Sequence, residues 1–287
     1  MTQAATRAEQ RRALFRIVMA FLKIAVAIYV LLLAGLYLCQ RQLEYIPVSF
    51  YPGTPKENNV PEMSIVTVRT SDNLSLIGWF AGPKHVGGKV VVLFHGQGID
   101  FGENAFKARY FLNAGYGVFL SEYPGFAGNP GTPTEEGLYR GARAVMGWLK
   151  DQGYDAHVVV LYGESLGTGV AVQMATEFPV ADLILEAPYA SAVEIAAHRY
   201  PYFPIRQLMK DPLDSLSKIA RVTSPMLIVH GALDADIPIE YGRKLFDAAT
   251  APKKFLVVQG AGHPPDLYNH GAGKMIVDWL DKQGKAK

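Results

Sequence analysis

The sequence predicts an α/β protein with a mostly parallel sheet and helices on both faces, preceded by one N-terminal transmembrane helix. Strand-like and helix-like segments alternate after residue 62. The later strand-like segments, such as 157–162 and 225–230, are short unbroken apolar runs. Such runs are typical of parallel strands that are buried on both faces. Together with a long apolar run near the N-terminus, these observations predict an anchored α/β domain.

Eight strands and five helices are expected in the domain. The strands fall at 64–70, 74–81, 89–94, 116–121, 157–162, 182–187, 225–230 and 254–258, and the helices near 103–114, 134–150, 166–178, 239–248 and 271–282. The first two strands alternate polar and apolar residues, which favours an antiparallel edge. The chain has 287 residues, 49% of them hydrophobic, and a net charge of +2. It can therefore bury one large core, and its charge implies no nucleic-acid partner.

The apolar run covers residues 17–39 and carries one charge, Lys23. As a helix it would span about 35 Å, enough for the hydrocarbon core of a bilayer. A buried core helix and a cleaved signal peptide are the alternatives. The basic flank on one side argues against the first, and the length of the run and the lack of an Ala-x-Ala-like site argue against the second. Membrane attachment through an uncleaved, single-pass helix is therefore expected.

Basic residues precede the apolar run, so the positive-inside rule places the N-terminus in the cytoplasm. The expected parts are a basic cytoplasmic segment at 1–16, the anchor at 17–39, a proline-rich connector at 40–62 and a domain at 63–287. That domain would lie outside the cytoplasm, in the periplasm if the cell is Gram-negative. Cys39 is the single cysteine, and no Cys/His cluster or glycine-rich phosphate loop is present. No metal or cofactor is expected, and the sequence does not indicate the oligomeric state.

The pattern GESLG at 163–167 joins an expected strand to an expected helix. In a nucleophile elbow this sharp turn exposes the serine hydroxyl, and flanking glycines are needed because the backbone passes close to its neighbours. The five-residue pattern alone is weak evidence, but the strand before it and the helix after it supply the context. Ser165 is the expected nucleophile, with Gly163 and Gly167 as the flanking glycines.

A serine nucleophile needs a histidine base and an acid that orients it, in the chain order Ser, acid, His. Asp234 follows the strand at 225–230, and His263 follows the strand at 254–258. Asp236 is the rival acid, with helix capping as its alternative role. His198, His230 and His270 are the rival histidines. His198 precedes the acid in sequence, His230 belongs to a strand end where a structural role is more common, and His270 lies near the last helix.

The reaction also needs donors for an oxyanion. The strand at 89–94 ends in HGQG at 95–98, where Gly96 and Gly98 allow a tight turn. The expected donors are the backbone N–H groups of Gln97 and Leu166. His95 precedes the nucleophile in sequence and is expected to stabilise the turn rather than to act as a base.

Residues 63–287 resemble the α/β-hydrolase superfamily, specifically its membrane-anchored serine hydrolases with a short cap. The resemblance rests on HGQG at 95–98, YPGFAG at 123–128, PTEEG at 133–137, the elbow, and the segment 230–238. It implies a Ser165–Asp234–His263 triad that cleaves carboxylic ester or thioester bonds (EC class 3.1). Relatives in this group include lysophospholipases, monoacylglycerol lipases, depalmitoylases and proteins classed as S33-type serine aminopeptidases. Pro124, Ala127 and the Pro264-Pro265 pair depart from the usual pattern.

The segment 188–224 is longer than an ordinary connection and contains HRYPYFPI at 198–205. We expect a cap insertion that covers Ser165 and accepts an acyl chain, with an aromatic patch packed on the core as the equal alternative. An ester, lipid or acyl compound is the expected substrate. A serine peptidase and a non-catalytic scaffold with the same fold are the competing functions.

Overall fold

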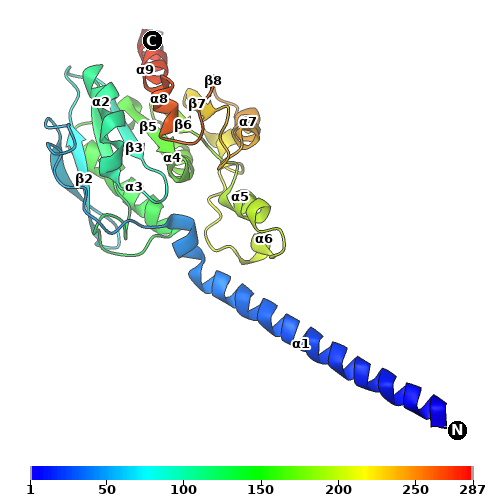
Figure 1. Ribbon diagram of the computed structural model, residues 1–287. Coiled ribbons are helices and arrows are strands. Elements are labelled where there is room, and N and C mark those ends of the chain that lie inside the picture. Colours follow the sequence, from blue (N-terminus) through cyan, green and yellow to red (C-terminus); the bar gives the residue numbers. More distant parts are fainter. Residues whose placement is uncertain (1, 286–287) are drawn as a thin grey trace. The chain divides into compact units, whose positions relative to one another are not determined.

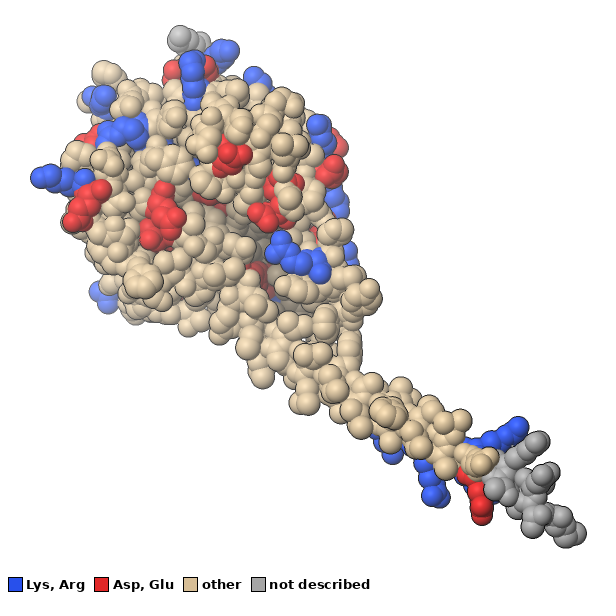
Figure 2. Space-filling model, viewed as in Figure 1, with Lys and Arg blue, Asp and Glu red and all other residues tan. Residues whose placement is uncertain are grey.

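The computed structural model describes residues 2–285, with the side chains of residues 9–284, and the chain divides into two units after Leu43. The first unit is almost entirely one helix, α1 (Thr2–Tyr45). Its part from Glu9 to Tyr45 is long and apolar enough to cross a membrane. Basic side chains gather toward its N-terminal end (Figure 2). The helix contains the apolar run at 17–39 and continues into the first residues of the segment expected as a connector.

The second unit is built on one eight-stranded sheet in the order β1-β2-β4-β3-β5-β6-β7-β8. The pairs β1–β2 and β2–β4 are antiparallel, and the other five are parallel. This confirms the predicted α/β class, the mostly parallel sheet and its antiparallel edge. The strands are β1 (Ser64–Arg69), β2 (Ser75–Ala81), β3 (Val90–Phe94), β4 (Gly117–Ser121), β5 (Val159–Glu164), β6 (Asp182–Glu186), β7 (Met226–Gly231) and β8 (Lys253–Val258).

Helices cover both faces of the sheet (Figure 1). One core cluster joins the sheet to α3 (Glu135–Asp151), α4 (Leu166–Glu177) and α7 (Ile239–Ala248), and the other joins it to α2 (Ala105–Asn113) and α9 (Ala272–Lys285). The central strands β3, β5 and β6 are buried at every residue. The unbroken apolar runs of the sequence are therefore explained by burial on both faces.

Several short helices complete the domain, and they lie in connections. They are η1 (Phe101–Asn104), η2 (Ala156–Val158), α5 (Ala192–Arg199), α6 (Ile205–Leu208), η3 (Ile219–Arg221) and α8 (Asp266–Asn269). Both α5 and α6 lie in the long connection from β6 to β7, at one end of the domain (Figure 1). The segment 188–224, expected as a cap, therefore contains short helices.

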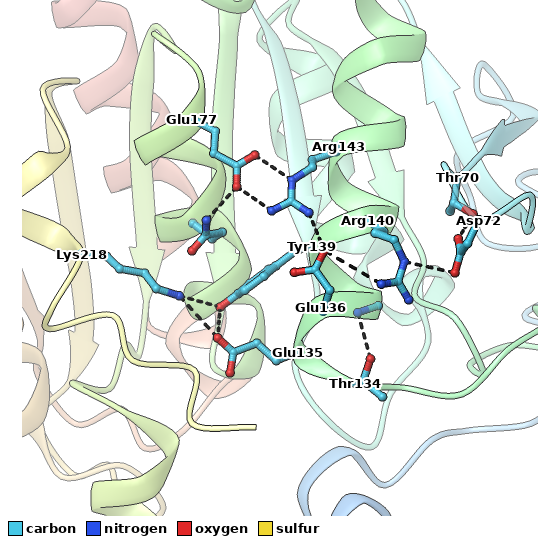
Figure 3. A network of polar contacts seen from close by, with 12 residues as sticks. Thr70, Asp72, Thr134, Glu135, Glu136, Tyr139, Arg140, Arg143, Glu177 and Lys218 are labelled. Carbon is cyan, nitrogen blue, oxygen red and sulfur yellow. Dashed lines mark hydrogen bonds and ion pairs between the residues drawn. The ribbon is translucent and has the colours of Figure 1, made fainter. Parts of the chain in front are cut away.

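Charged side chains of α3 tie this helix to its neighbours at the surface (Figure 3). Arg143 contacts Glu177 at the end of α4 through Nε and Oε2 at 2.8 Å. Arg140 contacts Asp72 of the β1–β2 turn through Nε and Oδ2 at 3.1 Å. Exposed pairs of this kind contribute at most about 1 kcal/mol each. They join α3 to the β1–β2 turn on one side and to α4 on the other.

Because β3, β5, β7 and β8 run parallel, their carboxyl ends all lie at the same end of the sheet. Ligands of open α/β sheets bind at this end. The loops that follow these four strands carry the residues singled out by the sequence.

Candidate active site

Ser165 lies in a sharp turn between β5 and α4. Its backbone has φ 48° and ψ −113°, a conformation that residues other than glycine rarely adopt. Such a conformation costs about 1–3 kcal/mol, so the surroundings must enforce it. Here the Ser165 N–H donates to the Glu186 carbonyl at 2.9 Å, and Thr168 donates to the Ser165 carbonyl through both its N–H and its hydroxyl.

The glycines around Ser165 are required by close backbone contacts. A Cβ atom at Gly167 would lie 2.1 Å from the Phe94 carbonyl oxygen, and one at Gly163 would lie 2.6 Å from the Gly167 carbonyl oxygen. At Gly96 a Cβ atom would lie 3.5 Å from Ser165 Cβ. The turn after β3 and the elbow after β5 are therefore in direct contact.

Ser165, His263 and Asp234 form a continuous hydrogen-bonded chain. His263 Nε2 lies 3.0 Å from Ser165 Oγ, and His263 Nδ1 lies 2.8 Å from Asp234 Oδ2. A carboxylate only accepts hydrogen bonds, so Nδ1 carries the proton of the neutral ring. Nε2 is then free to accept the serine proton. This is the arrangement of a nucleophile, a base and an orienting acid.

Contacts between the loops after β7 and β8 bring the acid and the base together. A Cβ atom at Gly231 would lie 2.1 Å from the Gly262 carbonyl oxygen, and the Leu233 N–H donates to the Ala261 carbonyl at 2.8 Å. The Pro264-Pro265 pair follows directly and leaves the histidine in reach of both partners. Close packing of two loops thus joins residues that are 29 positions apart in the chain.

Asp234 is held by donors on both carboxylate oxygens. Oδ1 accepts from the N–H groups of Asp236 and Ile237 at 3.0 and 2.9 Å, and Oδ2 faces both His263 and His230. Burial alone would raise the pKa of Asp234, but the neighbouring His230 ring and the hydrogen bonds from His263 and the Ile237 N–H outweigh it and hold the pKa far below its usual range. The acid is therefore ionised at neutral pH.

Burial lowers the pKa of His263, but the hydrogen bond and the charge of Asp234 outweigh it, so that the pKa lies above its ordinary value. The ordinary value for histidine is about 6.5. The neutral form, which a base requires, therefore predominates only at a higher pH than for a free histidine.

The rival acid and the rival histidines are not part of the hydrogen-bonded chain from Ser165 to Asp234. Asp236 is exposed, and the cap position of α7 is Pro238, without a side-chain cap. His230 is buried, and its Nε2 donates to the Ile237 carbonyl at 2.8 Å while lying 3.5 Å from Asp234 Oδ2. His198 and His270 are exposed. His230 therefore lies beside the acid Asp234 and is not the ring that contacts the Ser165 hydroxyl.

The expected oxyanion donors lie in two segments, Gln97 in the turn after β3 and Leu166 at the start of α4. Within the described residues, neither the Gln97 N–H nor the Leu166 N–H donates to a protein acceptor. Gly98 has φ 72°, a backbone conformation that glycine adopts without strain. Both donors lie in segments that meet at the elbow, and an oxyanion hole formed by them stays a prediction.

His95 fixes the plane of the peptide that carries the Gln97 N–H. Its Nδ1 donates to the Gly96 carbonyl at 2.7 Å, and its Nε2 lies 2.6 Å from Glu122 Oε1. The C=O and N–H of one trans peptide point in opposite directions, so holding the Gly96 carbonyl aims the Gln97 N–H away from His95. Burial lowers the pKa of His95, but Glu122 outweighs it and the pKa is raised. His95 therefore forms an ion pair with Glu122 and holds the turn, which is the kind of role expected for it from the sequence.

The aromatic residues expected in the cap differ in exposure. Tyr202 is 86% exposed and Tyr200 is 39% exposed, whereas Phe203 is partly buried. Phe203 lines a cavity between the insertion and α7, together with Ala197, His198, Pro201, Ile205 and Tyr241 among others. Ser165 is not among the residues that line this cavity. A cap that accepts an acyl chain stays a prediction.

Sequence reasoning missed a buried ionic cluster beside the elbow. Lys107 of α2 contacts Glu164 and Glu186, and all three side chains are almost completely buried. Two of these residues could have been noticed, because Glu164 and Glu186 end apolar strands where an unpaired charge would be costly. Lys107 gave no such signal, since a lysine on an amphipathic helix is ordinarily on the solvated face.

The chain is similar to several known proteins, although no family model matches it. It is 36% identical over 242 residues to an uncharacterized protein of Mycobacterium tuberculosis, covering 83% of this chain and 85% of that protein. It is 32% identical over 183 residues to the human alpha/beta hydrolase domain-containing protein 17B, covering 61% of this chain and 60% of that protein.

Solved structures with the same fold include an esterase of Pyrococcus furiosus, with a TM-score of 0.69 and 19% identity over 82% of this chain and 96% of that one. A monoacylglycerol lipase of Paleococcus ferrophilus gives a TM-score of 0.56 and 18% identity over 77% of this chain and 99% of that one. With the sheet order and the sequence relatives, these similarities show that the chain belongs to the α/β-hydrolase superfamily.

The pairing of Asp234 with His263 predicts a test by titration. Replacing Asp234 by Asn removes the negative partner of the ring, so the pKa of His263 is expected to fall. Histidine Cε1–H signals in an NMR titration of the full-length protein measure it, with His263→Gln to assign the signal. Asp236→Asn is the matched control and should shift the pKa less, because its carboxylate is exposed and screened. A larger shift for Asp236→Asn would identify the rival acid.

Proposed function

We propose that the protein is a serine hydrolase that cleaves carboxylic ester or thioester bonds through Ser165, His263 and Asp234. The observation that carries the proposal is the hydrogen-bonded chain from Ser165 Oγ through the two ring nitrogens of His263 to Asp234 Oδ2, at 3.0 and 2.8 Å. The two free backbone donors beside the hydroxyl, and the membership of a hydrolase superfamily, support it.

The proposed reaction is acyl transfer in two halves. Ser165 Oγ attacks the substrate carbonyl while His263 Nε2 takes the hydroxyl proton, and the new oxyanion accepts hydrogen bonds from the Gln97 and Leu166 N–H groups. His263 then gives its proton to the leaving alcohol or thiol, and an acyl-enzyme remains. A water molecule loses a proton to His263 and attacks the acyl carbonyl. His263 then returns that proton to Ser165 Oγ as the acid leaves, which regenerates the free serine. Asp234 stays ionised throughout and stabilises the protonated ring.

A lipid or acyl substrate is favoured over a small polar ester by two observations. The first is the apolar helix α1, which would hold the domain beside a bilayer. The second is the aromatic insertion between β6 and β7, whose Tyr200 and Tyr202 are exposed. One structural relative bears the name monoacylglycerol lipase. These observations favour an ester of a long acyl chain as the substrate class.

Covalent labelling tests the role of Ser165. A fluorophosphonate probe should label the full-length protein, and Ser165→Ala should abolish the labelling, because the probe reports only a serine activated by a base. Ser71→Ala, an exposed serine in the β1–β2 turn, is the matched control and should be labelled like the wild type. Equal labelling of the Ser165→Ala variant, or none of the wild type, would contradict the proposal and favour a scaffold.

Hydrolysis of p-nitrophenyl acetate, butyrate and dodecanoate measures the acyl preference, and aminoacyl p-nitroanilides test the peptidase alternative. We expect ester cleavage that depends on Ser165, with kcat/KM rising with chain length as more apolar surface is buried. Far faster turnover of the acetate would contradict an acyl-chain site. Cleavage of the anilides alone would indicate a peptidase.

We also propose that α1 anchors the protein as a single transmembrane helix with the N-terminus in the cytoplasm. Most of its large apolar side chains are exposed along the helix, for example Leu31 at 71% and Leu38 at 73%. Exposed apolar surface of this extent is costly in water and favourable in a bilayer. The cluster of arginines before the apolar run supports the orientation.

Membrane fractionation tests the anchor. The full-length protein should stay in the membrane pellet after an alkaline carbonate wash, and alkaline phosphatase fused to its C-terminus should be active, since that enzyme requires an extracytoplasmic location. Release by the wash, or a mature N-terminus located after residue 39, would contradict an uncleaved anchor. An inactive fusion in the pellet would reverse the proposed orientation.

A further inference from the structure

A lysine is buried completely beside the elbow. Lys107 lies on α2, its Nζ is 2.9 Å from Glu164 Oε2 and 2.5 Å from Glu186 Oε2, and its side chain has no exposed surface. Ion pairs of this kind are poor evidence for stability, because apolar residues of similar size often stabilise a core equally well. A gain in stability therefore does not explain why ion pairs are buried beside the elbow.

The two carboxylates are neighbours in the sheet. Glu164 and Glu186 occupy paired positions at the carboxyl ends of β5 and β6, so their side chains lie on the same face. Like charges directly opposite each other are destabilising. Lys107 compensates for this repulsion, with Asn104 Nδ2 donating to Glu164 at 2.8 Å and the Tyr162 hydroxyl donating to Glu186 at 2.6 Å.

This cluster connects the two backbone segments that carry the oxyanion donors. Glu164 directly precedes Ser165, and the Ser165 N–H donates to the Glu186 carbonyl. Asn104 and Lys107 lie in η1 and α2, which follow the turn that holds Gln97. A Cβ atom at Gly96 of that turn would lie 3.6 Å from Glu164 Oε1, so the carboxylate reaches the turn itself.

We propose that Lys107, Glu164 and Glu186 are positioning residues that hold the elbow against the oxyanion turn, and that the charge of Glu164 favours protonated His263 during the reaction. This inference rests on the serine-hydrolase mechanism proposed above. The cluster then has two separable effects. Its side chains link the two backbone segments, and the charge of Glu164 favours the protonated form of His263.

The protonation of the cluster supports the charge effect. Burial raises the pKa of Glu164, but Lys107 outweighs it and holds the pKa below its ordinary value. Burial and the neighbouring charge of Glu164 raise the pKa of Glu186. The lowered pKa keeps Glu164 ionised at neutral pH. Its carboxylate lies close to the site, because Glu164 directly precedes Ser165 and its Oε1 would lie 3.6 Å from a Cβ atom at Gly96. His263 is influenced by three carboxylates, those of Asp234, Asp236 and Glu164, and all of them raise its pKa.

Replacing Glu164 by Gln tests the charge at constant size. The neutral side chain keeps an oxygen for Asn104 or Lys107 but no longer favours protonated His263. We expect the acid limb of the pH profile of kcat/KM, measured with p-nitrophenyl butyrate, to move to lower pH by about half a unit. The melting temperature should change little, because Lys107 keeps its contact with Glu186 and no charge is left without a partner. Glu177→Gln on the surface of α4 is the matched control and should leave the profile unchanged.

Replacing Glu164 by Asp shortens the side chain at constant charge and so tests the positioning effect. The side chain is one methylene shorter, so it loses contact with Lys107 while remaining anionic. A small misplacement of catalytic groups can cost about 100-fold in rate. We expect kcat to fall about 10-fold or more, KM to change less than about twofold, and the acid limb to stay near that of the wild type.

Turnover of the wild type that Ser165→Ala abolishes is measured first, and its absence would overturn the proposed function itself. With that turnover present, an unmoved acid limb in Glu164→Gln would overturn the charge effect. An unchanged kcat in Glu164→Asp would overturn the positioning effect. A change in melting temperature alone, with kcat, KM and the pH profile unaltered in both variants, would reduce the cluster to a structural ion pair.

Discussion

The close approach of the elbow backbone to the end of β3 is the constraint on which the rest of the site depends. Gly167 leaves no room for a Cβ atom beside the Phe94 carbonyl, and Ser165 is held in a strained backbone conformation by hydrogen bonds to β6 and from Thr168. The contact places the start of α4 directly beside the turn after β3. Two backbone segments about 70 residues apart thereby meet beside Ser165.

Charges around this contact are arranged in pairs that are removed from water. His95 pairs with Glu122 beneath the oxyanion turn, and Lys107 pairs with Glu164 beneath the elbow. Asp234 and His263 form the third pair, in which the ring is the more accessible member. Each buried pair fixes a piece of backbone or a ring orientation, because breaking it would leave an uncompensated charge at a cost of about 3–5 kcal/mol. The side chains and backbone around Ser165 are therefore held in place by several independent buried contacts.

The sequence predicted the strands and long helices well because burial on both faces imposes uninterrupted apolar runs, as in β3 and β5. The short helices α5 and α6 were not predicted, since an insertion outside the sheet lacks such periodicity. The elbow could be recognised because its glycines are dictated by close backbone contact. The side chains of Asp234 and His263 could be expected near Ser165 because parallel strands end at one edge. Lys107 could not be found, because only the tertiary structure shows that its face of α2 is buried.

Crystallography of the full-length protein after reaction with an alkyl fluorophosphonate tests the account most directly, since the tetrahedral adduct resembles the intermediate. The account predicts phosphorus bonded to Ser165 Oγ, with its phosphoryl oxygen about 2.7–3.1 Å from the backbone nitrogens of Gln97 and Leu166. Phosphorus bonded to another residue, or an oxygen directed away from both nitrogens, would contradict it.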